Sequence, residues 1–192
     1  MTKDRILSAA KAVLETAGIE GLTIRRVAQQ AELSPMALYR HFADKDALLN
    51  ALMEDGIAAW TDIVHGVRAR DPLEWLLAVG EAHLDFALTQ PHRYDAAFFL
   101  PAPAARRFPD DFAAGRSPAL AMVMARIDQL QADRRLSGKP TLEIALAAVA
   151  LGQGLVSMHR ANRFASEKQF KALYRAAQRN FFDSLKSSGE TK

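Results

Sequence analysis

Several features that mark other classes of protein are missing from this 192-residue sequence. It has no cysteine, which excludes a disulfide framework and thiolate metal sites and favours a reducing compartment. We find no apolar run as long as a membrane span and no apolar region of the signal-peptide type near the N-terminus. No stretch alternates apolar and polar residues as a strand would. We therefore expect a cytoplasmic, all-α protein that does not enter membranes.

Catalytic and metal-binding signatures are also lacking. The chain contains no Gly-x-Ser-x-Gly, no phosphate-binding glycine loop and no His-Glu-x-x-His. The pair Gly152 and Gly154 lacks the preceding strand that a phosphate loop requires, and His83 and His92 are not spaced as helical metal ligands. The sequence therefore predicts a protein that is not an enzyme and that has no metal site and no cofactor.

The distribution of charge does not by itself identify a partner. The formal net charge is +3, but residues 1–50 carry seven Lys and Arg side chains against six Asp and Glu. Much of the basic excess lies near the C-terminus instead. If the N-terminal region binds nucleic acid, a few placed side chains must do so rather than the net charge.

The most informative stretch is residues 23–49, which predicts two short helices joined by a tight turn and the start of a third. Thr23 can cap the first helix, and Ser34 followed by Pro35 restarts the second. On the second helix Leu38 and Phe42 face inward, whereas Met36 and Arg40 lie on the opposite face. A short helix with one buried and one exposed face has the geometry of the recognition helix in a helix-turn-helix motif.

Residues 4–49 resemble the DNA-binding domain of the TetR family of transcriptional regulators. The matching words are Arg5-Ile6-Leu7-Ser8-Ala9-Ala10, Gly18, Thr23-Ile24-Arg25-Arg26-Val27-Ala28, Leu33-Ser34, Leu38-Tyr39-Arg40-His41-Phe42 and Lys45-Asp46-Ala47-Leu48-Leu49. The resemblance implies about nine helices: a three-helix DNA-binding head at residues 1–48 and a helical ligand-binding and dimerisation body at residues 49–192.

The resemblance and the chemistry of base recognition together predict which residues touch DNA. Small, apolar and guanidinium groups on the recognition helix would approach the major groove, and hydroxyl, imidazole and ammonium groups around it would hold phosphates. These residues are Thr23, Arg25, Ser34, Pro35, Met36, Ala37, Tyr39, Arg40, His41 and Lys45. The turn reads Ser-Pro-Met-Ala before Leu-Tyr instead of the commoner form with Lys-Gly-Thr, so the operator sequence is not predicted.

The rest of the chain predicts a series of helices, each with a start signal. A long helix from Lys45 to about Val67 joins the head to everything that follows. Further helices are expected at about 72–89, 90–99, 117–135, 141–162 and 166–185, with a proline-rich connection at 100–116.

The resemblance implies that the last two helices pair with those of a second copy as a four-helix bundle. The helix at 141–162 is apolar on nearly two faces, which fits this reading, although both helices could simply be core. The candidate interface residues are Leu151, Leu155, Met158, Tyr174, Phe181 and Phe182.

A pocket for a small-molecule effector is a further expectation from the resemblance. Candidate lining residues are Trp60, Phe86, Phe98, Phe99, Met122 and His159. Apolar stripes at helical spacing are more often plain core than a binding site, so both readings stay open for each residue.

The resulting hypothesis is a homodimeric repressor that binds a palindromic double-stranded DNA operator and is released by a small-molecule inducer. The helix from Lys45 would carry the conformational change between body and head. Two alternatives remain: a ligand-blind DNA-binding activator or architectural protein, and a helical ligand-binding scaffold with no DNA affinity.

Overall fold

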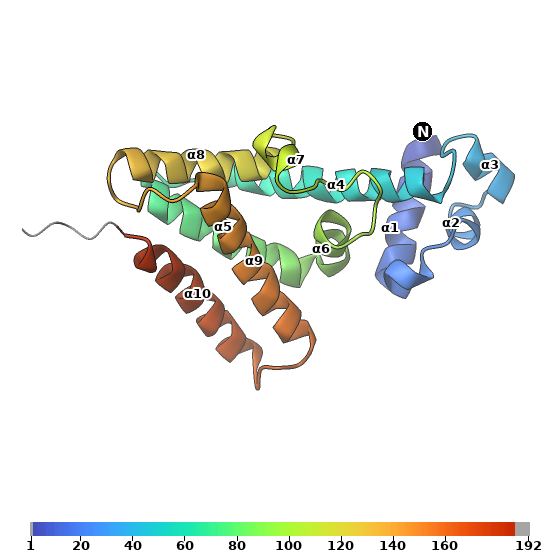
Figure 1. The fold of residues 1–192 in the computed structure, drawn as a ribbon. Coiled ribbons are helices and arrows are strands. Elements are labelled where there is room, and N and C mark those ends of the chain that lie inside the picture. The colour runs from blue at the N-terminus through green and yellow to red at the C-terminus, as the bar shows by residue number, and fades with distance from the viewer. Residues whose placement is uncertain (1, 187–192) are drawn as a thin grey trace, which may run out of the picture. The chain divides into compact units, whose positions relative to one another are not determined.

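The computed structural model describes residues 2–186, which form ten helices and, apart from one isolated bridge between Leu136 and Lys186, no extended pairing. This confirms the all-α prediction (Figure 1). The helices are α1 (Thr2–Gly21), α2 (Ile24–Gln30), α3 (Pro35–Tyr39), α4 (Lys45–Gly66), α5 (Pro72–Thr89), α6 (Pro91–Phe98), α7 (Asp110–Ala113), α8 (Pro118–Ala132), α9 (Thr141–Arg160) and α10 (Glu167–Ser184).

The chain divides into two compact units. The first unit comprises the residues up to Asp62 together with Thr89–Ala105, and the second comprises Ile63–Leu88 together with the chain from Arg106 onward. Helix α4 runs from the first unit into the second. The predicted boundary at residue 48 separates a DNA-binding head from a body by function, whereas this division separates compact units. The boundary at residue 48 therefore stays a prediction.

Helix starts follow the capping signals in the sequence. The side-chain oxygens of Thr23, Ser34, Asp44 and Ser166 each accept a hydrogen bond from the backbone amide three residues later, at 3.2, 3.1, 2.7 and 3.2 Å. Each cap satisfies an amide that has no partner within its helix. Gly18 interrupts α1 with a φ of 64° and a ψ of −172°, a positive φ that lies outside the left-handed helical basin.

The core of the first unit is built from α1 to α4 and from a segment that the sequence did not mark as structural. Leu100 and Ala102, which follow α6 in the predicted connection, are buried in the same cluster as the helical residues. Asn50 on α4 accepts a hydrogen bond from the Ala104 amide at 2.9 Å. The main members of this core are Ile6, Ala10, Val13, Val27, Leu38, Leu48, Leu49 and Leu52 from the helices and Phe42 from the turn after α3.

Helices α4 and α6 approach each other closely at Gly56. A Cβ atom at this position would lie 2.7 Å from the Ala97 amide nitrogen and 2.9 Å from the Arg93 carbonyl oxygen. The neighbouring Asp55 forms two ion pairs. Its Oδ1 lies 2.6 Å from Lys11 Nζ on α1, and its Oδ2 lies 3.4 Å from Arg93 Nε on α6. Residues of three helices therefore meet around this part of α4.

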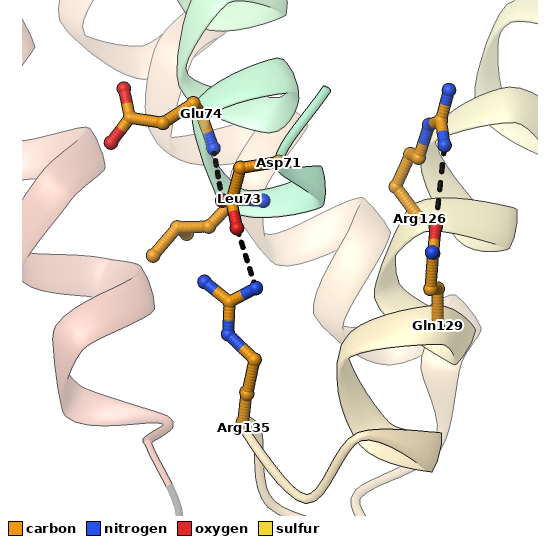
Figure 2. Close-up of polar contacts among 6 residues, drawn as sticks. All are labelled: Asp71, Leu73, Glu74, Arg126, Gln129 and Arg135. Atoms are coloured by element: carbon orange, nitrogen blue, oxygen red, sulfur yellow. Dashed lines mark hydrogen bonds and ion pairs between the residues drawn. The ribbon is translucent and has the colours of Figure 1, made fainter. Parts of the chain in front are cut away.

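In the second unit α9 packs against both α8 and α10, and the last two helices form a hairpin (Figure 1). Figure 2 shows how α5 begins: Asp71 Oδ1 accepts hydrogen bonds from the Leu73 and Glu74 amides at 2.9 and 3.1 Å, and Arg135 Nη1 lies 2.6 Å from Asp71 Oδ2. The hydrogen bond from Arg135, assisted by these amides, lowers the pKa of Asp71.

Helix α9 is the one helix within residues 2–186 that is long and apolar enough to cross a membrane by length and composition. Its most apolar 18-residue stretch has a mean hydropathy of 1.5, and 22% of that stretch is buried. The expectation that no apolar run reaches this length therefore does not hold for α9. A single helix of this kind does not indicate a membrane protein, because helices that pack in cores or against partners have the same composition.

Candidate nucleic-acid interface

Helix α3 has one face in the core of the first unit and one face in solvent. Leu38 is buried, and so is Phe42, which lies just beyond the end of the helix rather than on it as predicted, whereas Met36 is 71% exposed and Tyr39 is 47% exposed. Of the ten residues predicted to touch DNA, Ala37 is half-buried and the other nine are exposed. Met36 and Tyr39 therefore add apolar surface to the exposed side of α3.

The exposed end of α3 presents several hydrogen-bonding groups in a short stretch. The helix ends at Tyr39, Arg40 is its C-cap residue, and the His41 amide closes the turn on the Leu38 carbonyl at 2.9 Å. The Tyr39 hydroxyl, the Arg40 guanidinium and the His41 imidazole are therefore exposed on consecutive residues. Such groups can donate to phosphate oxygens, and a guanidinium can also donate to guanine edges.

The turn before α3 has a defined hydrogen-bonded form. The Leu33 amide donates to the Ala28 carbonyl at 2.9 Å and the Glu32 amide to the Gln29 carbonyl at 3.1 Å, with Glu32 at a φ of 53°. This is the Schellman pattern at the C-terminus of α2, with glutamate where glycine is usual. The direction in which α3 leaves the turn depends on this geometry.

Two residues at the start of α1 contact the helix-turn-helix motif, and the sequence interpretation did not assign them a role. Arg5 donates from Nε and Nη2 to the Ala31 carbonyl, at 3.0 and 2.5 Å. Lys3 Nζ lies 5.5 Å from the centre of the Phe42 ring. In the sequence, the feature that could have indicated these contacts is the positive charge of both residues next to the apolar stripe of α1.

A cavity of about 300 Å³ lies in the second unit between α5 and α10. Its lining includes Gly80, Glu81, Tyr174, Arg175 and Gln178 and none of the six predicted ligand-binding residues. The Arg175 guanidinium pairs with both carboxylate oxygens of Glu81, at 2.8 and 2.9 Å, and this hydrogen bonding raises the pKa of Arg175. The cavity is therefore polar at its edge.

Tyr174, which lines this cavity, takes part in a buried polar contact between α5 and α10. His83 Nδ1 is 2.9 Å from the Tyr174 hydroxyl, and both residues are buried. Burial lowers the pKa of His83 to about 4, because the imidazolium cation would lose its hydration there. The imidazole is consequently neutral at physiological pH.

The six predicted ligand-binding residues are divided between the two units. Trp60 and Phe98 of the first unit have ring centres 6.0 Å apart, and Phe99 is exposed nearby in the chain. In the second unit Phe86 is fully buried and His159 stacks on Phe170 at 4.2 Å. The remaining candidate, Met122, is half-buried on α8. That these residues line one pocket stays a prediction.

The six predicted dimer residues differ in how much surface they offer. Tyr174 and Phe182 are buried within the second unit, so a partner could not reach them without rearrangement. Leu151, Leu155 and Phe181 are half-buried and Met158 is 47% exposed. Leu173 on α10, which is 48% exposed, was not among the candidates.

Among residues 2–186 no group of three or more His, Asp and Glu side chains is arranged to hold a metal ion.

Two protein families match this chain. The model for bacterial regulatory proteins of the tetR family matches residues 6–52, which include all of α2 and α3. The model for the tetracyclin repressor-like C-terminal domain matches residues 76–181, more than half of the chain. The chain belongs to the tetR family. The predicted resemblance is thereby confirmed and extends beyond the N-terminal quarter.

Individual tetR-family relatives match only part of the chain. The tetracycline repressor protein class C of Escherichia coli is 41% identical over 54 residues, which are 28% of this chain and 25% of the repressor. The uncharacterised regulator YobS of Bacillus subtilis is 26% identical over 98 residues, which are 50% of this chain and 51% of YobS. The chain thus spans about a quarter to a half of the length of these relatives.

Solved structures share the whole fold at low identity. A protein of unknown function from Rhodococcus sp. RHA1 superimposes with a TM-score of 0.79 at 23% identity, over 98% of this chain and 96% of that one. A putative tetR-family transcription regulator from Shewanella sp. PV-4 gives a TM-score of 0.75 at 20% identity, over 98% and 100%. At these identities the likeness concerns the fold alone.

Proposed function

We propose that this tetR-family protein is a DNA-binding transcription regulator whose α3 enters the major groove of double-stranded DNA. The observation that carries the proposal is α3 itself, a five-residue helix held by a buried Leu38 while Met36, Tyr39 and Arg40 are exposed. In helix-turn-helix proteins the second helix presents its exposed side chains to base edges in this way.

The contacts divide into base readers and phosphate holders. Met36, Ala37 and Arg40 face the bases, where Arg40 donates to guanine and the apolar side chains touch thymine methyl groups. Thr23, Arg25, Ser34, Pro35, Tyr39, His41 and Lys45 surround them and hold or approach the backbone. Because the head is nearly neutral, these local groups rather than net charge provide the binding energy.

Paired substitutions separate the two kinds of contact. Arg40→Ala is expected to lower affinity for the specific site by about 1–3 kcal/mol and to relax base preference at one position. Lys45→Ala is expected to weaken all DNA about equally and to reduce the salt slope by about one. Gel shifts with DNA flanking the coding region, at several salt concentrations, measure both. Normal specific binding by Arg40→Ala would show that Arg40 is not a base reader.

Within the same proposal the regulator acts as a homodimer on a palindromic operator. A head of this size makes few base contacts, and two-fold pairing doubles them. Helix α9 is strongly apolar yet only partly buried, and Leu151, Leu155, Met158 and Leu173 supply apolar surface on the α9–α10 hairpin. Light scattering at micromolar concentration tests this point, and a monomer would contradict it.

Repression relieved by a small molecule completes the proposed mechanism. Two relatives, the class C tetracycline repressor and DrrR1 of Streptomyces coeruleorubidus, are named as repressors. The ligand must bind more tightly to a conformation of the body, residues 49–192, in which the heads of residues 1–48 do not match the operator. Helix α4 is the continuous element that joins them. An operator affinity that no bound ligand alters would refute this part.

The same proposal makes the protein a cytoplasmic regulator rather than an enzyme. It rests on the family, whose named members are regulators, and on the absence of catalytic motifs from the sequence. We expect the protein to bind the DNA that flanks its own coding region in cells and to be recovered in the soluble fraction. Recovery with membranes would contradict the cytoplasmic assignment and would point to α9, the helix that is long and apolar enough to cross a membrane.

A further inference from the structure

Helix α3 is too short to hold its own direction. A helix of five residues lies below the length at which helices are stable in water, and Leu38 is its one buried residue. The orientation of its exposed face must therefore be imposed from outside. The turn that precedes it is the first candidate for that role.

That turn leaves two carbonyl groups in need of donors. Glu32 adopts a left-handed φ of 53°, which a residue with a Cβ atom adopts at some energetic cost. The Ala31 and Glu32 carbonyls lie beyond the last bonds of α2 and cannot be satisfied inside that helix. Without an outside donor these carbonyls would hydrogen-bond to water, and the two backbone hydrogen bonds of the turn alone would hold its geometry.

Arg5 of α1 supplies that donor. Its Nε and Nη2 atoms lie 3.0 and 2.5 Å from the Ala31 carbonyl oxygen, and Nη2 lies 3.4 Å from that of Glu32. A guanidinium presents its N–H groups in a rigid fork, and a cation at a helix C-terminus also favours the helix dipole. Arg5 is exposed, so it adds little to the apolar core.

We propose, on the basis of the proposed DNA-binding function, that Arg5 is a positioning residue for recognition. It fixes the turn between α2 and α3, and thereby the direction of α3, without touching DNA. Lys3, whose ammonium lies over Phe42 just beyond α3, holds the other end of the same helix. The first turn of α1 thus sets the angle at which the recognition helix is presented.

The test compares Arg5→Gln and Arg5→Lys with a matched control. Arg68→Gln removes the same charge and a similar contact, from Arg68 Nη1 to the His65 carbonyl at the end of α4, away from the head in the sequence. Each full-length protein is measured on a duplex that the wild type selects from a random pool and on an unrelated duplex of the same length, over a range of salt. Urea unfolding of each variant is recorded in parallel.

Arg5→Gln is expected to bind the selected duplex about tenfold more weakly, the effect of one charge-assisted hydrogen bond. Its affinity for the unrelated duplex and its salt slope stay as in the wild type, since no phosphate contact is lost. Arg5→Lys recovers part of the loss, because an ammonium can still donate to the Ala31 carbonyl. Arg68→Gln binds both duplexes normally.

Amide hydrogen exchange gives a readout in the absence of DNA. Exchange at Glu32 and Leu33 is expected to accelerate in Arg5→Gln and not in Arg68→Gln. Unchanged exchange together with normal specific affinity would overturn the inference, as would equal weakening on both duplexes with a flatter salt slope, which indicates a phosphate contact. A wild-type protein that selects no duplex would instead refute the proposed function. If Arg5→Gln does not fold, the comparison rests on Arg5→Lys.

Discussion

The buried histidine of the second unit makes stability depend on pH in a defined direction. His83 on α5 lies against the Tyr174 hydroxyl of α10 at 2.9 Å, and burial lowers its pKa from 6.5 to about 4. In the unfolded chain the imidazole returns to its ordinary pKa. The unfolded state therefore binds one more proton than the folded state at pH values between 4 and 6.5.

The sign and size of the effect follow from this difference. Because protons bind preferentially to the unfolded chain, the free energy of unfolding falls as pH falls through that window and is fully retained above pH 6.5. From about pH 7.5 to about pH 5, the two pKa values give a loss of about 2 kcal/mol from this one residue. Carboxylates add their own pH dependence, so the prediction concerns a difference between variants.

Urea unfolding at several pH values and one fixed protein concentration measures this loss. His83→Gln removes the titrating group, so its stability is expected to be lower at neutral pH but to fall less steeply toward pH 5, by about 2 kcal/mol over the range. His65→Gln, at the exposed end of α4, is the control for removing a histidine from the surface. Parallel pH profiles for wild type and His83→Gln would refute the reasoning, because they would mean that His83 titrates alike in both states.

Glycine-to-alanine substitutions test two close contacts. Gly56→Ala is expected to lower the free energy of unfolding by about 1–3 kcal/mol, because the added Cβ meets the backbone of α6. Gly66→Ala on the same helix meets nothing within 4 Å and is expected to raise the free energy of unfolding by up to about 1 kcal/mol. Urea unfolding measures both. Gly152→Ala would place its Cβ 2.8 Å from the Tyr174 hydroxyl and should cost about 1 kcal/mol, with Gly154→Ala as the unobstructed control in α9. Equal stability changes within either pair would show that these contacts do not govern packing.

Local chemistry accounts for what the sequence predicted well. A capping side chain such as Ser34 or Asp44 acts within three residues, so its effect on a helix start can be read without knowing the rest of the fold. The sequence also predicted that Leu38 and Phe42 are buried, which the structure confirms, although α3 ends at Tyr39 and Phe42 lies just beyond it. The family resemblance rested on short runs of neighbouring residues, and the tetR-family match over residues 6–52 confirms it.

Long-range packing accounts for what the sequence did not reveal. The proline-rich stretch after α6 reads as a connection, yet Leu100 and Ala102 complete the core of the first unit. Tyr174 and Phe182 share a helical stripe with exposed neighbours, and only their packing determines that they are buried. Gly56 reads as a weak helix former, whereas the backbone of α6 requires it.

By itself the sequence determined the helical class, most of the helix starts and the position of the short exposed helix α3, because hydrophobic period and capping are properties of neighbouring residues. The tertiary structure decided which side chains contact the turn before that helix and what surrounds His83. The contact from Arg5 to Ala31 joins residues 26 positions apart, and that from His83 to Tyr174 joins residues 91 apart. No local pattern encodes such pairs, since they form only when the chain has brought separate helices together.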